Sequence, residues 1–117
     1  MLELRLPFPA KELSPNARLH WAKVAKVKKA HRAEAYYTAL PFRGIYTGDE
    51  KLRLELTFFK PTRRAMDMDN LLARMKAGLD GIADGLGIND RIFDPVVVSV
   101  SDQTGGYVLI KIMRVEE

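Results

Sequence analysis

Four stretches of the chain alternate apolar and polar residues with the period of two that is typical of a half-buried β-strand. The first runs from Leu2 to Phe8, and the second and clearest runs from Leu52 to Phe58. A third begins in the valine-rich stretch Val96–Val100, and a fourth covers Tyr107–Val115. The intervening segment Asp102–Gly106 is rich in turn residues. It predicts that the last two strands form a hairpin.

A long helix is predicted from about Arg18 to Leu40, where apolar residues recur at roughly the helical period of 3.6 residues. The turn Lys11–Asn16 precedes it, and Ser14–Pro15 within that turn would provide its N-cap and a first-turn proline. Pro41 ends the helix. Trp21 has two interpretations, a core anchor or an exposed stacking surface, and we favour the core because large aromatic side chains are usually buried.

A second helix is predicted from Asn70 to about Ala83, with Gly85 and Gly87 as C-terminal stop signals. Its apolar stripe consists of Leu72, Met75, Leu79 and Ile82. The resulting order, β-α-β-α-β-β, predicts an α/β (α+β) fold in which two helices pack on a mixed sheet. A length of 117 residues indicates a single domain, residues 1–117.

Composition narrows the class of protein. Hydrophobic residues make up 47% and charged residues 29%, which is typical of a globular chain. The absence of cysteine excludes a disulfide framework, a thiol nucleophile and a cysteine-based zinc site, and it fits a reducing compartment. No stretch approaches the roughly 18 apolar residues that span a membrane, and the N-terminus has no basic leader. We therefore expect a cytoplasmic protein without a membrane partner.

Positive charge is clustered along the chain, although the net charge is only +4. Between Leu13 and Ala33 there is no acidic residue, and a second basic cluster follows the second strand. Such clusters favour a polyanion as partner, and a solvated helix face is the alternative. The basic residues expected to contact the phosphates of a polyanion such as DNA are Lys23, Lys26, Lys28, Lys29, Arg32, Arg63 and Arg64.

The second basic cluster leads into two aspartates, Asp67 and Asp69, placed one residue apart. If Met66–Asp69 is extended, both carboxylates point to the same side, about 7 Å apart along the backbone. A hard cation such as Mg²⁺ would relieve their mutual repulsion. The alternative is that one of them caps the following helix, and the two roles are not exclusive.

Two further residues could join this site. Seven residues correspond to about 700° of helix, so Lys76 would lie about 20° from Asp69 and could face a phosphate. Its alternative role is a surface pair with Asp80, four residues on. Asp90 lies in a loop before a strand, where site residues concentrate, although Asn-Asp is also ordinary turn chemistry.

Several common kinds of catalytic site can be excluded from the sequence. The two histidines lie in the basic helix and suit neither a zinc site nor a serine-hydrolase triad, and there is no phosphate-binding glycine loop. A Mg²⁺ ion held by carboxylates, which activates water and stabilises charge at a scissile phosphate, fits the residues that remain.

The run Arg63–Leu72, the helix with a lysine and Leu79–Asp80, and then Gly87–Asp90 resemble the RusA family of Holliday-junction resolvases. That family reads R-x-x-D-x-D-N-L, with a lysine on the helix and an acidic pair after a glycine-containing loop. The opening Leu6–Pro9 is similar too, and the resemblance covers nearly the whole chain. It implies a RusA-like fold and a homodimeric crossover junction endodeoxyribonuclease. Such an enzyme uses Mg²⁺, with Mn²⁺ as a substitute, and nicks four-way DNA junctions in recombination and repair in bacteria and their phages.

Carried over residue by residue, the resemblance makes Asp67, Asp69 and Asp90 the catalytic carboxylates that bind the metal. Asn70 would support them, and Lys76 would be the catalytic lysine. A two-fold dimer would match the two symmetric scissile sites of a junction.

The chain departs from the family pattern in three places. The stretch from Asp69 to Asp90 is about three residues longer than in the founding members of the family. The family's helix lysine corresponds to Ala73 here, so Lys76 one turn further on, or Arg74, would have to replace it. The first member of the acidic pair is Asn89, so that only the second acid is carried over. Two alternatives stay open: a non-catalytic basic DNA-binding module on the same fold, and a nuclease acting on flaps or other branched DNA.

Overall fold

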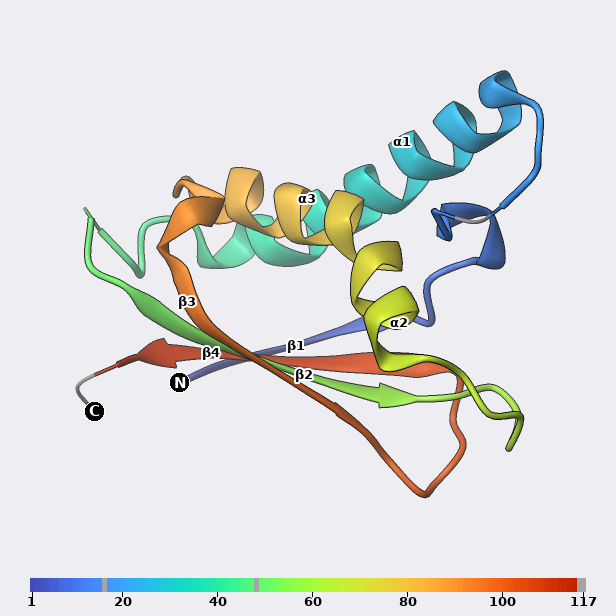
Figure 1. Ribbon diagram of the computed structural model, residues 1–117. Coiled ribbons are helices and arrows are strands. Elements are labelled where there is room, and N and C mark those ends of the chain that lie inside the picture. Colours follow the sequence, from blue (N-terminus) through green and yellow to red (C-terminus); the bar gives the residue numbers. More distant parts are fainter. Residues whose placement is uncertain (16, 48, 116–117) are drawn as a thin grey trace.

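Four strands form one mixed sheet, and helices cover one of its faces (Figure 1). The computed structural model describes residues 1–15, 17–47 and 49–115. The strands are β1 (Leu2–Pro7), β2 (Leu52–Phe59), β3 (Phe93–Val100) and β4 (Tyr107–Arg114). The α-helices are α1 (Trp21–Ala39), α2 (Met68–Arg74) and α3 (Lys76–Leu86). The expected α+β class is confirmed.

The order of strands across the sheet is β1-β4-β2-β3. β4 is antiparallel to both of its neighbours, and β3 is parallel to β2. The predicted hairpin between β3 and β4 is therefore wrong, because β2 lies between them. The connecting segment instead crosses the end of β2, where Ser101 N–H donates to Phe58 O (2.9 Å) and Gly106 N–H donates to Phe59 O (2.8 Å).

The period of two in the sequence corresponds to the two faces of the sheet. Leu54 and Leu56 of β2, with Ile110 and Ile112 beside them on β4, are completely buried under the helices. The intervening residues, such as Glu55, lie on the other face and are half-buried. Among the described residues, no helix is long and apolar enough to cross a membrane.

The single second helix that the sequence predicts is two helices. Met75 N–H donates to Leu72 O (3.0 Å), one residue closer than in an α-helix, and Met75 both ends α2 and precedes α3. Figure 1 shows the change of direction between them. Because Met75 is completely buried, it fixes this bend to the core.

Glycines let α1 and α3 approach closely. A Cβ added to Gly81 would collide with the backbone oxygen of Arg32, and one added to Gly85 would lie 2.6 Å from Tyr36 O. The interpretation of Gly85 as a stop signal is therefore wrong, because it is a packing residue inside α3. Gly87 is the C-terminal cap, with a left-handed φ of 77° that favours glycine.

The beginning of α1 differs from the expectation. The helix starts at Trp21, and His20 is its N-cap, with Nδ1 accepting a hydrogen bond from Ala22 N–H (3.2 Å). Ser14–Pro15 therefore does not start the helix: Ser14 is the C-cap of a 3₁₀ turn (Lys11–Leu13), and residues 17–20, which have no regular secondary structure, precede α1. Asn16, part of the predicted turn, lies outside the described residues.

Trp21 is 76% exposed, so its expected role as a core anchor is wrong. The first turns of α1 project beyond the sheet and have no core to enter (Figure 1). The buried face of α1 begins later, at His31, and continues at intervals of four residues with Ala35 and Ala39.

His31 brings a titratable ring into this helix interface. It is 9% exposed, and among the described residues its Nε2 is the buried side-chain atom that has no hydrogen-bond partner. Burial lowers the pKa of His31 from its ordinary value of 6.5, and nearby Glu34 only partly offsets this shift. The folded protein therefore favours the neutral ring.

We expect the free energy of unfolding to fall as the pH drops below 6.5. The unfolded chain then binds a proton that the folded His31 resists, and the loss is complete below the folded pKa. Denaturant titrations of the wild type and of His31→Leu at a series of pH values would measure this contribution. The difference between the two proteins should change over this pH range, and parallel curves would contradict the prediction.

Candidate nucleic-acid interface and acidic pair

The acidic pair lies where the chain enters α2. Asp67 is the N-cap of the helix, and its Oδ1 accepts a hydrogen bond from Asp69 N–H (3.1 Å). The condition that Met66–Asp69 is extended does not hold, because the helix already begins at Met68. Both carboxylates are exposed and close in sequence, so a shared cation remains chemically reasonable.

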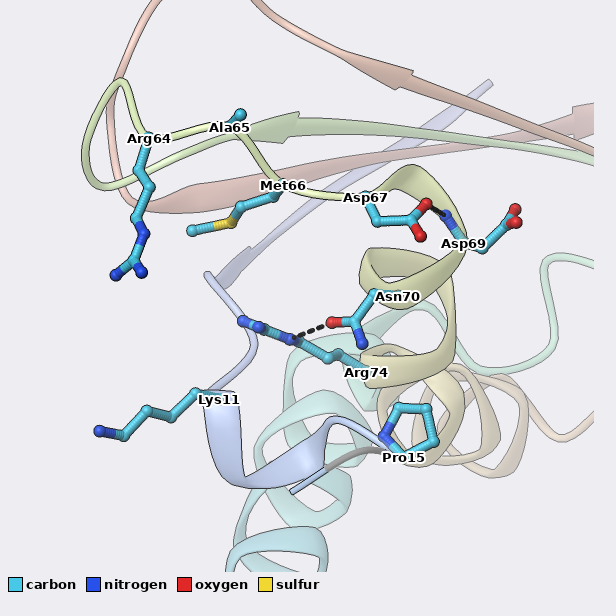
Figure 2. A pocket seen from close by; sticks show the side chains of 9 residues that line it. All are labelled: Lys11, Pro15, Arg64, Ala65, Met66, Asp67, Asp69, Asn70 and Arg74. Carbon is cyan, nitrogen blue, oxygen red and sulfur yellow. Dashed lines mark hydrogen bonds between the residues drawn. The ribbon is translucent and has the colours of Figure 1, made fainter. Parts of the chain in front are cut away.

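A pocket of about 630 Å³ opens beside the pair, and Asp67 and Asp69 both line it. Three cationic side chains, Lys11, Arg64 and Arg74, line the same pocket. In Figure 2 the ends of Lys11 and Arg64 lie across the pocket from Asp69, whose carboxylate points outward. The pocket thus has Asp67 and Asp69 along one side and three cationic side chains along the rest of its lining, with the Asp69 carboxylate turned toward solvent.

Asn70 holds the far wall of this pocket in place. Its Nδ2 donates to Ser14 Oγ (2.7 Å). Its Oδ1 accepts from Arg74 Nε (2.9 Å), and Figure 2 draws this second bond. The amide therefore ties the segment before α1 to α2 and orients the Arg74 guanidinium. Asn70 was expected to support the site, and in this structure it contacts Arg74 rather than the aspartates.

Lys76 lies elsewhere than the helical spacing suggested. Its Nζ is 3.4 Å from Asp80 Oδ1 and 3.9 Å from Asp90 Oδ2. The argument that placed Lys76 beside Asp69 assumed one continuous helix, and the bend at Met75 removes that assumption. The structure brings Lys76 together with Asp90. Lys76 also forms the surface pair with Asp80 that was the alternative interpretation.

Asp90 belongs to a second acidic group near the end of α3. A hollow of about 260 Å³ is lined by Asp80, Asp84 and Asp90 together with Arg32. Arg32 forms an ion pair with Asp84, whose hydrogen bond and negative charge raise the pKa of the guanidinium. Arg32, one of the predicted DNA contacts, is therefore partly neutralised by this carboxylate.

A third hollow of about 700 Å³ connects the two acidic groups between α1 and the start of α3. It shares Arg74 with the first pocket and both Arg32 and Asp80 with the Asp90 hollow. Its basic lining residues are Lys28, Lys29, Arg32, Arg74 and Lys76. We call these three connected hollows the basic groove.

The other predicted basic contacts lie around this groove. Lys23 and Lys26 are exposed on the projecting half of α1, and Arg63 is exposed in the segment after β2. Arg64 lines the acidic-pair pocket itself. Sequence reasoning missed Lys11, since a single lysine in a turn carries no spacing signal that links it to α2.

The oxygen donors fit a metal ion only in part. Across residues 1–15, 17–47 and 49–115, no three His, Asp or Glu side chains gather closely enough to hold an ion. Asp67 and Asp69 provide two carboxylates at one place, and Asp90 stands beside Lys76 at another. Two carboxylates with water and substrate phosphates are sufficient for Mg²⁺.

Comparison with known proteins adds a bacterial relative. No family model matches the chain. An uncharacterized protein of Xylella fastidiosa is 45% identical over 98 residues, which cover 80% of this chain and 63% of that protein. The matched region thus spans somewhat less than two thirds of the relative's length, and the chain is similar to a bacterial protein.

Proposed function

We propose that this protein is a Mg²⁺-dependent endonuclease that resolves four-way DNA junctions. One observation carries the proposal: a single pocket is lined by the neighbouring aspartates Asp67 and Asp69 together with Lys11, Arg64 and Arg74. Carboxylates attract a hard cation, whereas guanidinium and ammonium groups attract phosphate. A phosphodiester needs both kinds of group when a metal-assisted nuclease cleaves it.

Each part of the pocket then has a task. Asp67 and Asp69 would hold Mg²⁺, which supplies an activated water and stabilises charge on the phosphate. Arg74, oriented by Asn70 (2.9 Å), would bind a phosphate oxygen next to the scissile bond. Arg74 suits the role of the family's helix lysine better than Lys76, because it lines the same pocket as the acidic pair.

Asp90 and Lys76 form the second part of the proposal. The Lys76 side chain is three-quarters exposed and its Nζ lies 3.9 Å from Asp90 Oδ2, so this pair is open to solvent. An exposed pair of this kind is weakly held, and a phosphate can therefore draw the lysine toward DNA. Asp90 would be the third catalytic carboxylate once DNA occupies the basic groove.

The basic groove would hold one duplex arm of the junction. Lys28 and Lys29 on α1 and Lys76 on α3 line it and can bind phosphates regardless of base sequence. A homodimer would present two such grooves to the symmetric junction. We place this activity in the bacterial cytoplasm, where recombining DNA is found.

A cleavage assay tests the proposal. A labelled four-way junction and a linear duplex of the same sequence would be incubated with the protein in Mg²⁺, in Mn²⁺ and in EDTA. Paired nicks near the crossover, present with metal and absent in EDTA, are expected. Binding without cleavage in every metal tried would overturn the enzyme assignment, and equal cutting of the linear duplex would overturn junction selectivity.

One observation favours a second function, a non-catalytic DNA-binding module. Asp67 already has a structural role as the cap of α2, which explains an aspartate at this position without a metal. That function predicts DNA binding that does not respond to Mg²⁺. A nuclease for flaps or other branched DNA would instead cut those substrates faster than four-way junctions in the same assay.

A further inference from the structure

The first turns of α1 carry an aromatic surface that the proposed nuclease site does not use. Trp21 is 76% exposed and is the one tryptophan of the chain. The ring of His20 stacks on it, with centroids 5.6 Å apart and an angle of 29° between the planes. Two flat rings are thus held side by side, and burial of such large apolar surface by a partner is favourable.

We use the name α1 arm for residues 17–24, which contain these rings. The arm projects beyond the sheet, as the blue end of the helix shows in Figure 1. Leu19 is also 40% exposed there. Exposed apolar surface at the tip of a projecting element indicates an interaction site.

The charge around the rings identifies the class of partner. Arg18 and Lys23 flank them within the arm, and Lys26 lies on the next turn. No acidic residue occurs between Leu13 and Ala33. A partner with flat apolar faces and a regular negative backbone complements this combination, and unpaired nucleic acid has both.

A hollow connects the α1 arm to the acidic pair. It has a volume of about 330 Å³ and is lined by Arg18 and Leu19 of the arm together with Lys11 and Arg74. Lys11 and Arg74 also line the pocket of Asp67 and Asp69. A strand whose phosphates follow these cationic side chains would pass from the pocket to Trp21.

We propose that Trp21 is a stacking platform for unpaired DNA bases, which in the proposed junction substrate are those opened at the branch point. The bases stack on the indole face beside His20, and Arg18, Lys23 and Lys11 bind the adjacent phosphates. Because every base has a flat face, this contact does not depend on base sequence. The inference extends the proposed nuclease by naming the part of its substrate that α1 binds, and it can hold for a binding module as well.

The single tryptophan makes the proposal directly measurable. Fluorescence of the full chain would be followed during titration with a short oligothymidine and, separately, with a blunt duplex hairpin of the same length. We expect the oligothymidine to quench the fluorescence of Trp21. In a polarisation assay with labelled oligonucleotide, the wild type should bind it at least ~10-fold more tightly than Trp21→Ala does. Trp21→Phe should retain most of the affinity, because a phenyl ring still stacks.

Tyr37→Ala is the matched control. Tyr37 is 69% exposed on the same helix, but it lies near the other end, one turn from Glu34. Its removal should leave oligothymidine affinity unchanged. Thermal unfolding of all variants should agree with that of the wild type, since both side chains are exposed.

Several outcomes would overturn the proposal. Equal affinity of the wild type and Trp21→Ala, or unchanged fluorescence at saturating oligothymidine, would remove the stacking role. Quenching or a blue shift only with vesicles of phosphatidylcholine and phosphatidylserine would assign the arm to a membrane surface. Emission that depends on protein concentration without DNA would assign it to a second copy of the chain.

These results are separate from the test of the nuclease. Loss of oligothymidine binding in Trp21→Ala, together with no cleavage of any junction, would support the stacking platform and reject the nuclease. Metal-dependent cleavage with equal oligothymidine affinity in wild type and Trp21→Ala would support the nuclease and reject the stacking platform.

Discussion

Asp69→Asn is expected to reduce junction cleavage by at least ~100-fold while junction binding is retained or becomes tighter. The amide has nearly the shape of the carboxylate, but it lacks the charge that holds a divalent cation, and such an ion supplies several kcal/mol of transition-state stabilisation. Binding should not weaken, because the substitution removes a negative charge from a pocket with three cations. Cleavage rates under single-turnover conditions and gel-shift affinities in Ca²⁺ would measure the two effects.

Asp67→Asn separates the metal role from the capping role. Asparagine is also a good N-cap, so its side-chain oxygen can still accept from Asp69 N–H and stability should be unchanged. Cleavage should nevertheless fall as in Asp69→Asn. Asp102→Asn, an exposed change in the β3–β4 connection, is the matched control with full activity. Full activity in both Asp67→Asn and Asp69→Asn would contradict the nuclease and leave the binding module.

Gly81→Ala is expected to lower the free energy of unfolding by about 2–3 kcal/mol, the upper part of the usual range for overpacking. The added methyl group collides with the Arg32 backbone oxygen and lies 3.0 Å from the Ala35 Cβ, so α1 and α3 must separate. Neither the backbone oxygen of Arg32 nor the Cβ of Ala35 can move aside by a side-chain rotation. The loss exceeds the gain of about 1 kcal/mol that alanine brings to a helix. Urea titrations monitored by circular dichroism would measure it.

Gly78→Ala provides the comparison within the same helix. There the added methyl group meets the ring of His31, with Nε2 2.6 Å away, and a side chain can turn where a backbone oxygen cannot. We therefore expect a loss of about 1 kcal/mol or less after the gain in helix propensity. Equal losses in Gly78→Ala and Gly81→Ala would show that the backbone contact is not the cause.

The local features of the fold were predictable from the sequence. The alternation in β2 identified a strand whose Leu54 and Leu56 are completely buried, as a period of two on a covered sheet requires. The pairing of the strands was not predictable in this way. A turn-rich segment indicates that the chain reverses. Only non-local packing decides that β2 lies between β3 and β4 in the sheet.

In the candidate site, too, local features were predictable from the sequence and features that depend on tertiary packing were not. The acidic pair was recognisable by its spacing, and the structure places Asp67 and Asp69 on one pocket. The position of Lys76 was wrong because the buried side chain of Met75 bends the helix, and local periodicity does not reveal a bend. Trp21 was misplaced because a statistical preference for burial says nothing about where a helix extends past its core.

The central place of β4 bears on how the protein folds during synthesis. β1 pairs with β4 alone, and β4 is also the antiparallel neighbour of β2. While the ribosome has made only the first hundred residues, β1 has no partner strand, and its apolar side chains depend on chaperones or on the helices for cover. Arrival of β4 then joins both halves of the sheet in one step. The pocket lined by Lys11 and Asp67 is built from segments that follow β1 and β2, so a nascent chain cannot complete this pocket before β4 is in place.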